Sequence, residues 1–363
     1  MRPAHAPPSQ RDHVRLLAVD PRVARASDFP FVHLAELLAP GDLVVVNDAA
    51  TLPASLAGTT ADGAAIELRL VTGRLADTAH PSDPGNDALW QAAVLGAGDW
   101  RTPTEHRPLP PSLPPGARLG FAGGLGAEVL GHAALSPRLV TIRFDRSGDA
   151  LWQALYAAGK PIQYSYLDGE VALWSVQTAF AARPWAVEMP SAGRAITGAV
   201  MRALRQRGVD IAWLTHAAGL SATGDPAIDE ALPLPERYEI PAGTVRAIAR
   251  ARARGARVIA VGTTVVRALE GCAATHGSLQ PGHGVTDLLI GPSFRPTVID
   301  GLLTGMHEPT SSHFRMLQAF APRALLDTSW AEATRLGYRG HELGDSCLIA
   351  PGVLAAIPDR LAA

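Results

Sequence analysis

Short apolar runs and alternating runs dominate the first part of the chain. Residues 43–46 are an apolar run between Pro40-Gly41-Asp42 and Asn47-Asp48, and they predict a buried strand that ends at this polar pair. Residues 138–144 alternate between apolar and polar side chains, which is typical of a strand with one buried face. The same criteria predict strands at residues 66–71, 90–95, 118–121 and 127–130, the last two joined by a glycine-rich hairpin.

Helical patterns appear only after residue 147. Asp149 can cap a helix over residues 150–158 that stops at Gly159, and Thr197 can cap one over 198–206 that stops at Gly208. Further helices are predicted at 244–254, 264–272, 314–320 and 325–335, and strands at 211–214, 257–261, 286–290, 298–303 and 347–349.

This distribution of elements predicts an α/β fold class with two domains. Residues 58–147 contain strand patterns only, and residues 72–116 are rich in Pro, Gly, Asp and Thr. We expect a mixed α/β main domain formed by residues 1–57 and 148–363, interrupted by an inserted all-β, barrel-like domain at 58–147. The length of 363 residues and the apolar fraction of 47% suit two domains.

The net charge of −2 does not indicate a nucleic-acid-binding protein. One short stretch is basic, and it contains Arg250, Arg252, Arg254 and Arg257. Two interpretations of it remain open. It is either a solvated helix end, where the helix dipole favours cations, or a patch that contacts phosphate.

Cysteine content and hydropathy limit the class of protein further. Cys272 and Cys347 are the two cysteines, too few for a disulfide framework or for a zinc site by themselves. The apolar runs are shorter than a membrane span needs, and the polar start of the chain lacks the apolar stretch of a signal peptide. We therefore expect a cytoplasmic protein without membrane attachment.

A predicted strand, the turn Gly262-Thr263-Thr264 and a predicted helix form the most informative local pattern. Glycine permits a tight turn, and the free amides of a helix start, together with two hydroxyls, can bind an anion or a carboxylate. The alternative is a plain helix cap with a surface ion pair between Arg267 and Glu270, three residues apart. The turn lacks the lysine and the glycine spacing of a Walker loop.

Other polar positions are candidates for binding or proton transfer. Asn47-Asp48 ends a strand, where either ligand contacts or an Asx turn are common. His307 and His313 lie in a hydroxyl-rich loop that either transfers protons or is only structural, and whose spacing is poor for a metal. His216 follows a strand and is either a base or a packing residue.

Tyr164 and Tyr166 either stack on a purine or fill a core, and Gly344-Asp345 is a turn before an apolar strand.

Taken in order, these segments resemble the S-adenosylmethionine:tRNA ribosyltransferase-isomerase family of the queuosine pathway. The similarity runs from about Arg11 to Ile349, and residues 257–270, similar to RVIAVGTTSVRxLE, are its most specific part. Other segments match in order and spacing: Arg15-Leu16-Leu17, residues 40–48, Pro53-Ala54-Ser55-Leu56, Gln177-Thr178, residues 300–312 and Gly344-Asp345.

The resemblance implies an all-β insert and an enzyme that uses S-adenosylmethionine as a ribosyl donor. In the family reaction, the ribosyl part is moved to the aminomethyl group of a deazaguanine base in tRNA and rearranged to an epoxycyclopentanediol. Adenine and methionine leave. Because a sulfonium acidifies the adjacent C5′ proton, the reaction requires a positioned base, and departing adenine requires a proton donor or hydrogen bonds.

The resemblance implies that S-adenosylmethionine is the co-substrate and that no metal is needed. It also suggests roles for individual residues. Donor binding is expected at Gly262, Thr263, Thr264 and Arg267. Catalytic or orienting roles are expected for His307, His216, Glu236 and Asp345. Further substrate contacts are expected at Asn47, Asp48, Gln177, Tyr166, Gly193 and Ser312.

The chain departs from the family's pocket motifs. Ala49-Ala50 replaces a segment with an arginine, residues 190–196 lack a histidine, and residues 231–236 lose two histidines and keep only Glu236. Residues 161–166, 216–224 and 305–307 also differ. These losses are more typical of a changed acceptor, a changed reaction or both, so we expect the donor site to be the better preserved part.

The acceptor is left open between deazaguanine-tRNA and a small molecule. Two alternatives to the transferase are an S-adenosylmethionine-cleaving enzyme without a tRNA acceptor and a non-catalytic paralogue that binds ligand or RNA. The sequence does not predict the oligomeric state.

Overall fold

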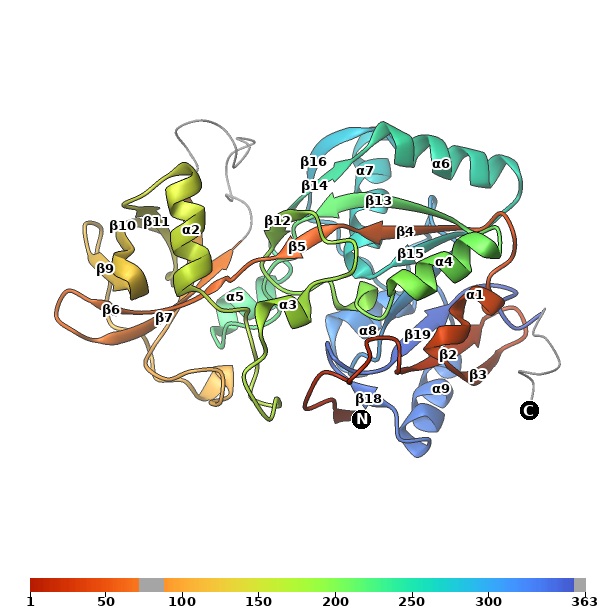
Figure 1. Ribbon diagram of the computed structural model, residues 1–363, viewed down its shortest axis with the longest axis horizontal. Helices are drawn as coiled ribbons and strands as arrows, with labels where there is room; N and C mark the ends of the chain where they lie inside the picture. The colour runs from red at the N-terminus through yellow and green to blue at the C-terminus, as the bar shows by residue number, and fades with distance from the viewer. Residues whose placement is uncertain (72–87, 356–363) are drawn as a thin grey trace.

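The computed structural model describes residues 1–71 and 88–355, and it contains a large twisted sheet beside a small barrel (Figure 1). The sheet has nine strands. In spatial order they are β16 (Gly282–Thr286), β14 (Glu236–Ile240), β13 (Asp210–His216), β4 (Leu43–Asn47), β15 (Val258–Val261), β17 (Gly301–Gly305), β19 (Ser346–Ile349), β2 (Arg15–Asp20) and β3 (Arg25–Pro30).

The four central strands β13, β4, β15 and β17 are parallel to one another, with Val44 of β4 beside Ile211 and Ile259 of its two neighbours. Antiparallel pairs β13–β14 and β17–β19 flank them. Strand β4 is buried along its whole length, as expected for a parallel strand covered on both faces. The apolar run at residues 43–46 therefore forms the centre of the sheet.

Helices cover both faces of this sheet. One face packs against α6 (Ala242–Ala253), α7 (Thr263–His276), α8 (Ser312–Leu317) and α9 (Arg323–Arg335). The other face packs against α1 (Leu34–Leu37) and α4 (Gly198–Gln206). Successive strand residues point to opposite faces, so the two cores share the same strands.

The barrel is closed by six antiparallel strands in the order β10-β11-β8-β7-β6-β9. Their bounds are β6 (Ser55–Thr60), β7 (Ala65–Val71), β8 (Leu89–Leu95), β9 (Arg118–Phe121), β10 (Gly126–Ala133) and β11 (Ser136–Phe144). Helix α2 (Gly148–Ala158) packs Leu151 and Leu155 into the barrel core. The expected α/β class with a barrel-like all-β part is confirmed, and the division at residues 58 and 147 stays a prediction.

Smaller elements connect these two parts (Figure 1). Strands β5 and β12 pair in parallel between the barrel and the sheet. The remaining short elements are β1 (Arg2–Pro3), η1 (Phe31–His33), β5 (Ala49–Thr51), η2 (Thr104–His106), η3 (Ala122–Gly124), α3 (Leu173–Val176), β12 (Arg183–Ala186), η4 (Ser191–Gly193), α5 (Pro226–Ala231) and β18 (Arg339–Gly340).

Several local predictions were correct in kind and wrong in detail. Thr197 caps α4 as expected and accepts a hydrogen bond from the Val200 amide at 3.3 Å. The cap position of α2 is Ser147, and Asp149 lies inside the first turn. The predicted strand at 286–290 is wrong, because the Thr286 hydroxyl accepts from the Leu288 amide at 3.2 Å and turns the chain where β16 ends.

The strand predicted at 298–303 begins only at Gly301, since the amides of Val298 and Ile299 donate to Glu270 instead of to a neighbouring strand.

The basic stretch favours the helix-end interpretation. Arg250 and Arg252 lie in the last turn of α6, as the helix dipole prefers. Arg257 pairs with the buried Asp42 at 2.6 Å, and its NH groups also reach backbone carbonyls.

Candidate active site

Candidate residues from the sequence meet at the carboxyl ends of the four parallel strands. Asn47 ends β4, His216 ends β13, and Gly262 follows β15. Thr304 is the second-to-last residue of β17. Because these strands are neighbours in the sheet, their ends lie side by side. Ligands of open α/β sheets bind at this edge.

Gly262 makes the tight turn between β15 and α7. Its φ of +90° is a conformation that side chains rarely adopt. Its amide donates to the Leu303 carbonyl at 2.8 Å, which fixes the turn against β17. Among the described residues no side chain caps α7, so Thr263 and Thr264, both half-buried, present hydroxyls beside the free amides of the helix start. This end of α7 can bind an anion.

Arg267 and Glu270 have different partners from those expected. The carboxylate of Glu270 accepts hydrogen bonds from the amides of Thr297, Val298 and Ile299 at 2.9–3.1 Å. Arg267 instead reaches across to Glu236 on β14, with 3.0 Å between Nε and Oε2. The alternative of a surface ion pair between Arg267 and Glu270 is therefore wrong, because both side chains are buried and each has a separate partner.

Glu236, Arg267 and His216 form a buried cluster, which we call the Glu236 cluster. The His216 ring is fully buried, and its Nε2 lies 3.4 Å from Glu236 Oε2. The other oxygen of Glu236 accepts from the Gly219 amide at 2.8 Å. Within the described part of the chain, neither ring nitrogen of His216 nor Nη2 of Arg267 has a hydrogen-bond partner. The cluster therefore retains unused donors and acceptors.

The environment sets the charges of this cluster. Burial, and then the positive charge of Arg267, lowers the pKa of His216 to about 3, so this imidazole is neutral at pH 7. Burial raises the pKa of Glu236, while Arg267 opposes the rise. Glu236 thus has the Arg267 guanidinium as its ion-pair partner, and at neutral pH the His216 ring is a neutral hydrogen-bond donor or acceptor.

Asn47 holds two strand ends and the start of α7 together. Its Nδ2 donates to the His216 carbonyl at 2.9 Å and to the Thr264 hydroxyl at 3.4 Å, and its Oδ1 accepts from the amides of His216 and Ala49. The predicted Asx turn is present, and the same side chain also links β4 with β13 and α7. Asn47 thus positions the residues around it.

Asp48 points to the other side of this edge. It accepts a hydrogen bond from the Thr215 hydroxyl at 2.6 Å. Burial raises its pKa, while Thr215 and Arg183 counteract that effect.

Two stacked histidines lie next to the Glu236 cluster. His307 Nε2 is 2.6 Å from the Thr304 hydroxyl, and its ring stacks on His313 with centroids 4.9 Å apart. Burial, followed by His313, lowers the pKa of His307 well below its usual range. Burial and then Arg267 lower the pKa of His313, which shows that the charge of Arg267 acts on this pair. His307 is therefore a neutral imidazole oriented by a hydroxyl.

Of four other expected site residues, three are engaged in structural contacts and one is exposed. Gln177 exchanges two hydrogen bonds of 2.8 Å with the backbone of Thr51. Asp345 accepts from the amides of Arg15 and Arg339, at 2.7 Å each. Ser312 is exposed, and its neighbour Ser311 is the residue that caps α8. Gly193 is packed so closely that an added Cβ would lie 2.9 Å from the Phe180 ring.

Tyr166 lies outside the Glu236 cluster, in an aromatic row. Its ring is nearly parallel to that of Tyr164, with centroids 6.3 Å apart, and it lies 4.3 Å from the ring of His341. This row borders a half-open pocket between the barrel and the sheet.

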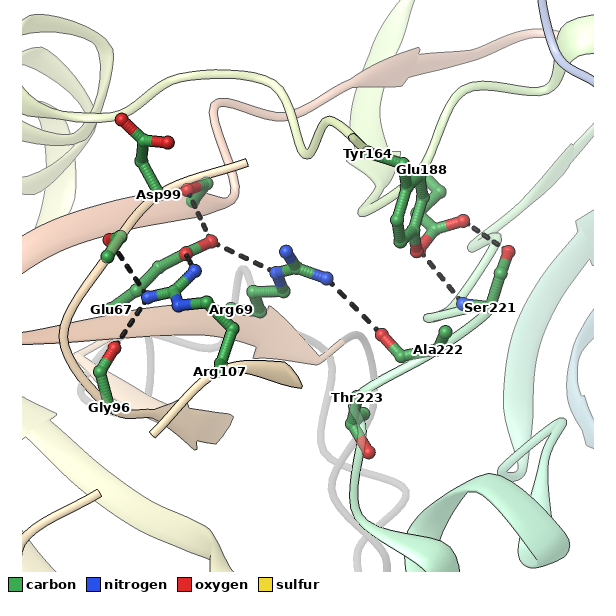
Figure 2. Close-up of polar contacts among 12 residues, drawn as sticks. Glu67, Arg69, Gly96, Asp99, Arg107, Tyr164, Glu188, Ser221, Ala222 and Thr223 are labelled. Carbon is green, nitrogen blue, oxygen red and sulfur yellow. Dashed lines mark hydrogen bonds and ion pairs between the residues drawn. The ribbon is translucent and has the colours of Figure 1, made fainter. Parts of the chain in front are cut away.

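Sequence reasoning missed a second polar network, where barrel strand β7 meets the segment that follows β13 (Figure 2). Glu67 pairs with Arg69 at 3.0 Å and with Arg107 at 2.6 Å, and all three are buried. Arg69 also donates to the Ala222 carbonyl at 3.3 Å, which links the barrel to the segment after His216. Two charged residues at alternate positions of the otherwise apolar β7 were the signal that pointed to it.

Neither a metal centre nor a membrane span emerges from the described ranges. In residues 1–71 and 88–355, His, Cys, Asp and Glu side chains form no group of three that could hold a metal ion. In the same ranges, every helix is too short or too polar to cross a bilayer.

Comparison with known proteins gives full-length similarity to one family. The family model described as queuosine biosynthesis protein matches residues 2–349. The S-adenosylmethionine:tRNA ribosyltransferase-isomerase of Trichlorobacter lovleyi is 33% identical over 354 residues, 95% of both chains. The enzyme of the same name from Sorangium cellulosum is 37% identical over 95% of this chain and 94% of its own.

A solved structure agrees with these similarities. The crystal structure of the S-adenosylmethionine tRNA ribosyltransferase from Thermotoga maritima is similar to this chain with a TM-score of 0.51 and 26% identity, covering 95% of each chain. The chain belongs to the queuosine biosynthesis protein family.

Proposed function

We propose that this protein is an S-adenosylmethionine:tRNA ribosyltransferase-isomerase that acts in queuosine biosynthesis. The observation that carries the proposal is similarity over 95% of both chains to enzymes named for this activity. The buried polar cluster at the carboxyl edge of the sheet provides a site where such chemistry can take place. S-adenosylmethionine is the co-substrate in this proposal, and tRNA is the partner.

The donor is proposed to bind at the start of α7. Gly262 lets the chain approach closely, and the free amides and hydroxyls of Thr263 and Thr264 suit the methionine carboxylate. Arg267 contributes positive charge, and its Nη2 lacks a hydrogen-bond partner within residues 1–71 and 88–355. An anion at this position gains from both the helix dipole and the guanidinium.

Proton transfer is proposed for His307. Its ring is neutral at pH 7 because burial lowers its pKa, so it can accept a proton from the carbon next to the sulfonium. The Thr304 hydroxyl, 2.6 Å away, fixes the orientation of the ring. Glu236 and His216 are proposed to position Arg267 and to stabilise charge in the pocket, while Asp48 and Asp345 act as positioning residues.

The acceptor is proposed to be a deazaguanine base in tRNA. The test is to incubate the full chain with S-adenosylmethionine, with and without tRNA that carries the aminomethyl-deazaguanine base, and to measure adenine and methionine. Release that requires the tRNA, together with an epoxycyclopentanediol on the base, is the expected result.

Other outcomes contradict the proposal in different ways. Release without tRNA would indicate an S-adenosylmethionine-cleaving enzyme or a small-molecule acceptor. Binding of S-adenosylmethionine without release would indicate a non-catalytic paralogue. If calorimetry detects no binding of S-adenosylmethionine at all, the donor site proposed at α7 is wrong.

A further inference from the structure

Two arginines meet at the short helix α3, away from the Glu236 cluster. Arg11 donates to the Trp174 carbonyl at 2.7 Å, and Arg194 Nε donates to the neighbouring Ser175 carbonyl at 3.2 Å. Arg194 directly follows η4, in a segment that packs into the core on the α4 side of the sheet. Both guanidiniums are thus held at one place by backbone carbonyls.

Arg194 is a buried cation without a counter-charge. The residue is only 5% exposed, and within residues 1–71 and 88–355 its two Nη groups have no hydrogen-bond partner. Burial, and then the positive charge of Arg11, lowers the pKa of Arg194 to about 10. Buried charges in proteins are normally paired, so this guanidinium indicates an anion that the chain itself does not supply.

Arg202 adds a third positive charge at the start of α4. Its guanidinium folds back along the helix, because Nη1 lies 3.6 Å from the place that a Cβ on Gly198 would take. The nearby carboxylate of Asp12 accepts a hydrogen bond from the Thr197 hydroxyl at 2.8 Å. In the described part of the chain none of the three arginines forms an ion pair, whereas exposed arginines of α9 pair with carboxylates one turn away. Positive charge is therefore in excess here.

Trp174 provides an exposed aromatic surface next to these charges. Its side chain is 72% exposed, while its carbonyl is held by Arg11. Proteins that bind single-stranded nucleic acid combine cations for the phosphates with aromatic rings on which bases stack. A small anion would use the guanidiniums alone, whereas an RNA strand uses both the guanidiniums and the indole. The combination favours RNA.

This group of side chains begins beside the proposed donor site. A Cβ added to Gly262 would lie 3.5 Å from the Cβ of Ala192, which belongs to η4 and lies two residues before Arg194. Helix α4 then leads back to the start of β13, the strand that ends at His216. An RNA strand bound at Arg194 and Arg202 would therefore lie next to the carboxyl edge of the sheet.

We propose that Arg11, Trp174, Arg194 and Arg202, which we call the Arg194 surface, bind the tRNA. The arginines contact backbone phosphates, and Trp174 stacks on a base that flanks the reacting one. The proposal rests on the proposed function, in which tRNA is the partner. It places the binding charge at one local surface of a chain whose net charge is only −2.

Fluorescence anisotropy tests the phosphate contacts without turnover. The full-length protein is titrated into labelled tRNA that carries the aminomethyl-deazaguanine base, at several salt concentrations and without S-adenosylmethionine. Arg194→Gln and Arg202→Gln should each raise the Kd about fivefold at about 0.1 M salt and reduce the salt slope by about 0.7, the value for one phosphate of a single strand. Arg250→Gln is the matched control, because Arg250 lies in the last turn of α6 on the opposite face. It should keep the wild-type Kd and slope.

Trp174 variants test stacking separately from charge. Trp174→Ala should raise the Kd for the tRNA at least about fivefold and leave the salt slope unchanged, whereas Trp174→Phe should retain most of the affinity. Thermal melting checks the fold of every variant. Arg202 and Trp174 are exposed, so their variants should melt as the wild type does and keep the test valid even if Arg194→Gln unfolds.

Three results would overturn the assignment. Wild-type affinity for the tRNA in both Arg202→Gln and Trp174→Ala would mean that this surface does not contact RNA. An equal loss in Arg250→Gln would mean that only the overall charge matters. If Arg194→Gln raises the Kd for S-adenosylmethionine and leaves tRNA binding unchanged, the missing anion is the donor's carboxylate and the RNA assignment is wrong.

The turnover assay separates this proposal from the proposed function. If adenine release requires tRNA and Arg202→Gln raises the KM for that tRNA while kcat changes little, both stand. If tRNA-dependent release occurs with an unchanged KM in Arg202→Gln and Trp174→Ala, the surface assignment fails alone. If the tRNA binds through Arg202 and Trp174 but adenine is never released, the proposed function fails and the Arg194 surface remains an RNA-binding site.

Discussion

Replacing Glu236 with glutamine tests whether the buried ion pair with Arg267 organises the site. The variant Glu236→Gln keeps an oxygen that can accept from the Gly219 amide, and it removes only the negative charge. Arg267 is then a buried guanidinium without a counter-charge, because its other potential partner, Glu270, is occupied by the backbone of residues 297–299.

The expected magnitude follows from the geometry. At the 3.0 Å separation of Nε and Oε2, the attraction is about 5 kcal/mol for an effective dielectric constant of about 20. Measured losses after removal of one partner of a buried pair are about 3–5 kcal/mol, since the other charge stays desolvated. For a chain of 363 residues, a loss of that size should lower the melting temperature by roughly 4–7 °C.

The matched control is Glu270→Gln, three residues from Arg267 on the same helix and equally buried. It weakens the hydrogen bonds to residues 297–299 and should cost about 2 kcal/mol. Both variants are assayed for adenine release at a temperature below their melting transitions. We expect Glu236→Gln to lose at least about tenfold in kcat/KM through displacement of Arg267, and Glu270→Gln to retain wild-type activity.

Two results would refute this reasoning. An unchanged melting temperature in Glu236→Gln would mean that the ion pair does not stabilise the fold. Equal losses of activity in both variants would mean that Glu236 acts only through the stability of α7 and has no specific effect on the site.

Three further predictions concern the turn, the buried histidine and the base. Gly262→Ala should cost about 1–2 kcal/mol of stability, because Gly262 has a positive φ, and should raise the Kd for S-adenosylmethionine. Gly277→Ala, at the far end of α7 and also with a positive φ, should cost stability alone. Equal Kd values for the two variants in calorimetry would contradict this prediction. The pKa of His216 is about 3 in the folded protein and about 6.5 in the unfolded chain, so its contribution to the free energy of unfolding is present above pH 6.5 and is lost on acidification. Between pH 7 and pH 5, urea unfolding should show about 2 kcal/mol more loss of stability in the wild type than in His216→Gln. Parallel plots of stability against pH for the two proteins would refute this prediction. His307→Asn should reduce the rate of adenine release at least about 100-fold with little change in S-adenosylmethionine binding. Thr304→Val, which removes the hydroxyl beside the ring, should give a smaller loss. A rate of His307→Asn within a few-fold of the wild type would exclude His307 as the base.

The fold could largely be predicted from hydrophobic patterning, because its central strands are buried on both faces. The apolar run that became β4 and the turn at Gly262 were both predicted, since each depends on local sequence. The strand predicted at 286–290 is wrong, because a hydrogen bond from the Leu288 amide to the Thr286 hydroxyl turns the chain where β16 ends, and no periodicity reveals such a bond. The late start of β17 has the same kind of cause, namely the carboxylate of Glu270.

The sequence did not predict which partners the charged residues of the site have. The spacing of Arg267 and Glu270 suggested a pair on one helix face, but burial of α7 turned each side chain towards a different element. Glu188 and Glu342 are far apart in the chain and border one pocket only because the connecting segments fold together. Long-range electrostatic partners depend on tertiary contacts, and local spacing carries little information about them.

The architecture separates the two halves of the proposed reaction onto different elements. The donor end is built from the turn at Gly262 and the ends of β4 and β17, which are fixed by backbone hydrogen bonds of the sheet. The pocket lined by Tyr164, Glu188 and Glu342 is built from connecting loops apart from these strand ends. The differences from the family at residues 216–224 and 231–236 fall in the connection that follows β13, where Ser221 donates hydrogen bonds to Glu188. Substitutions there can change the acceptor while the strand ends proposed to hold the donor stay in place, so divergence in these loops is compatible with the donor site proposed at the start of α7.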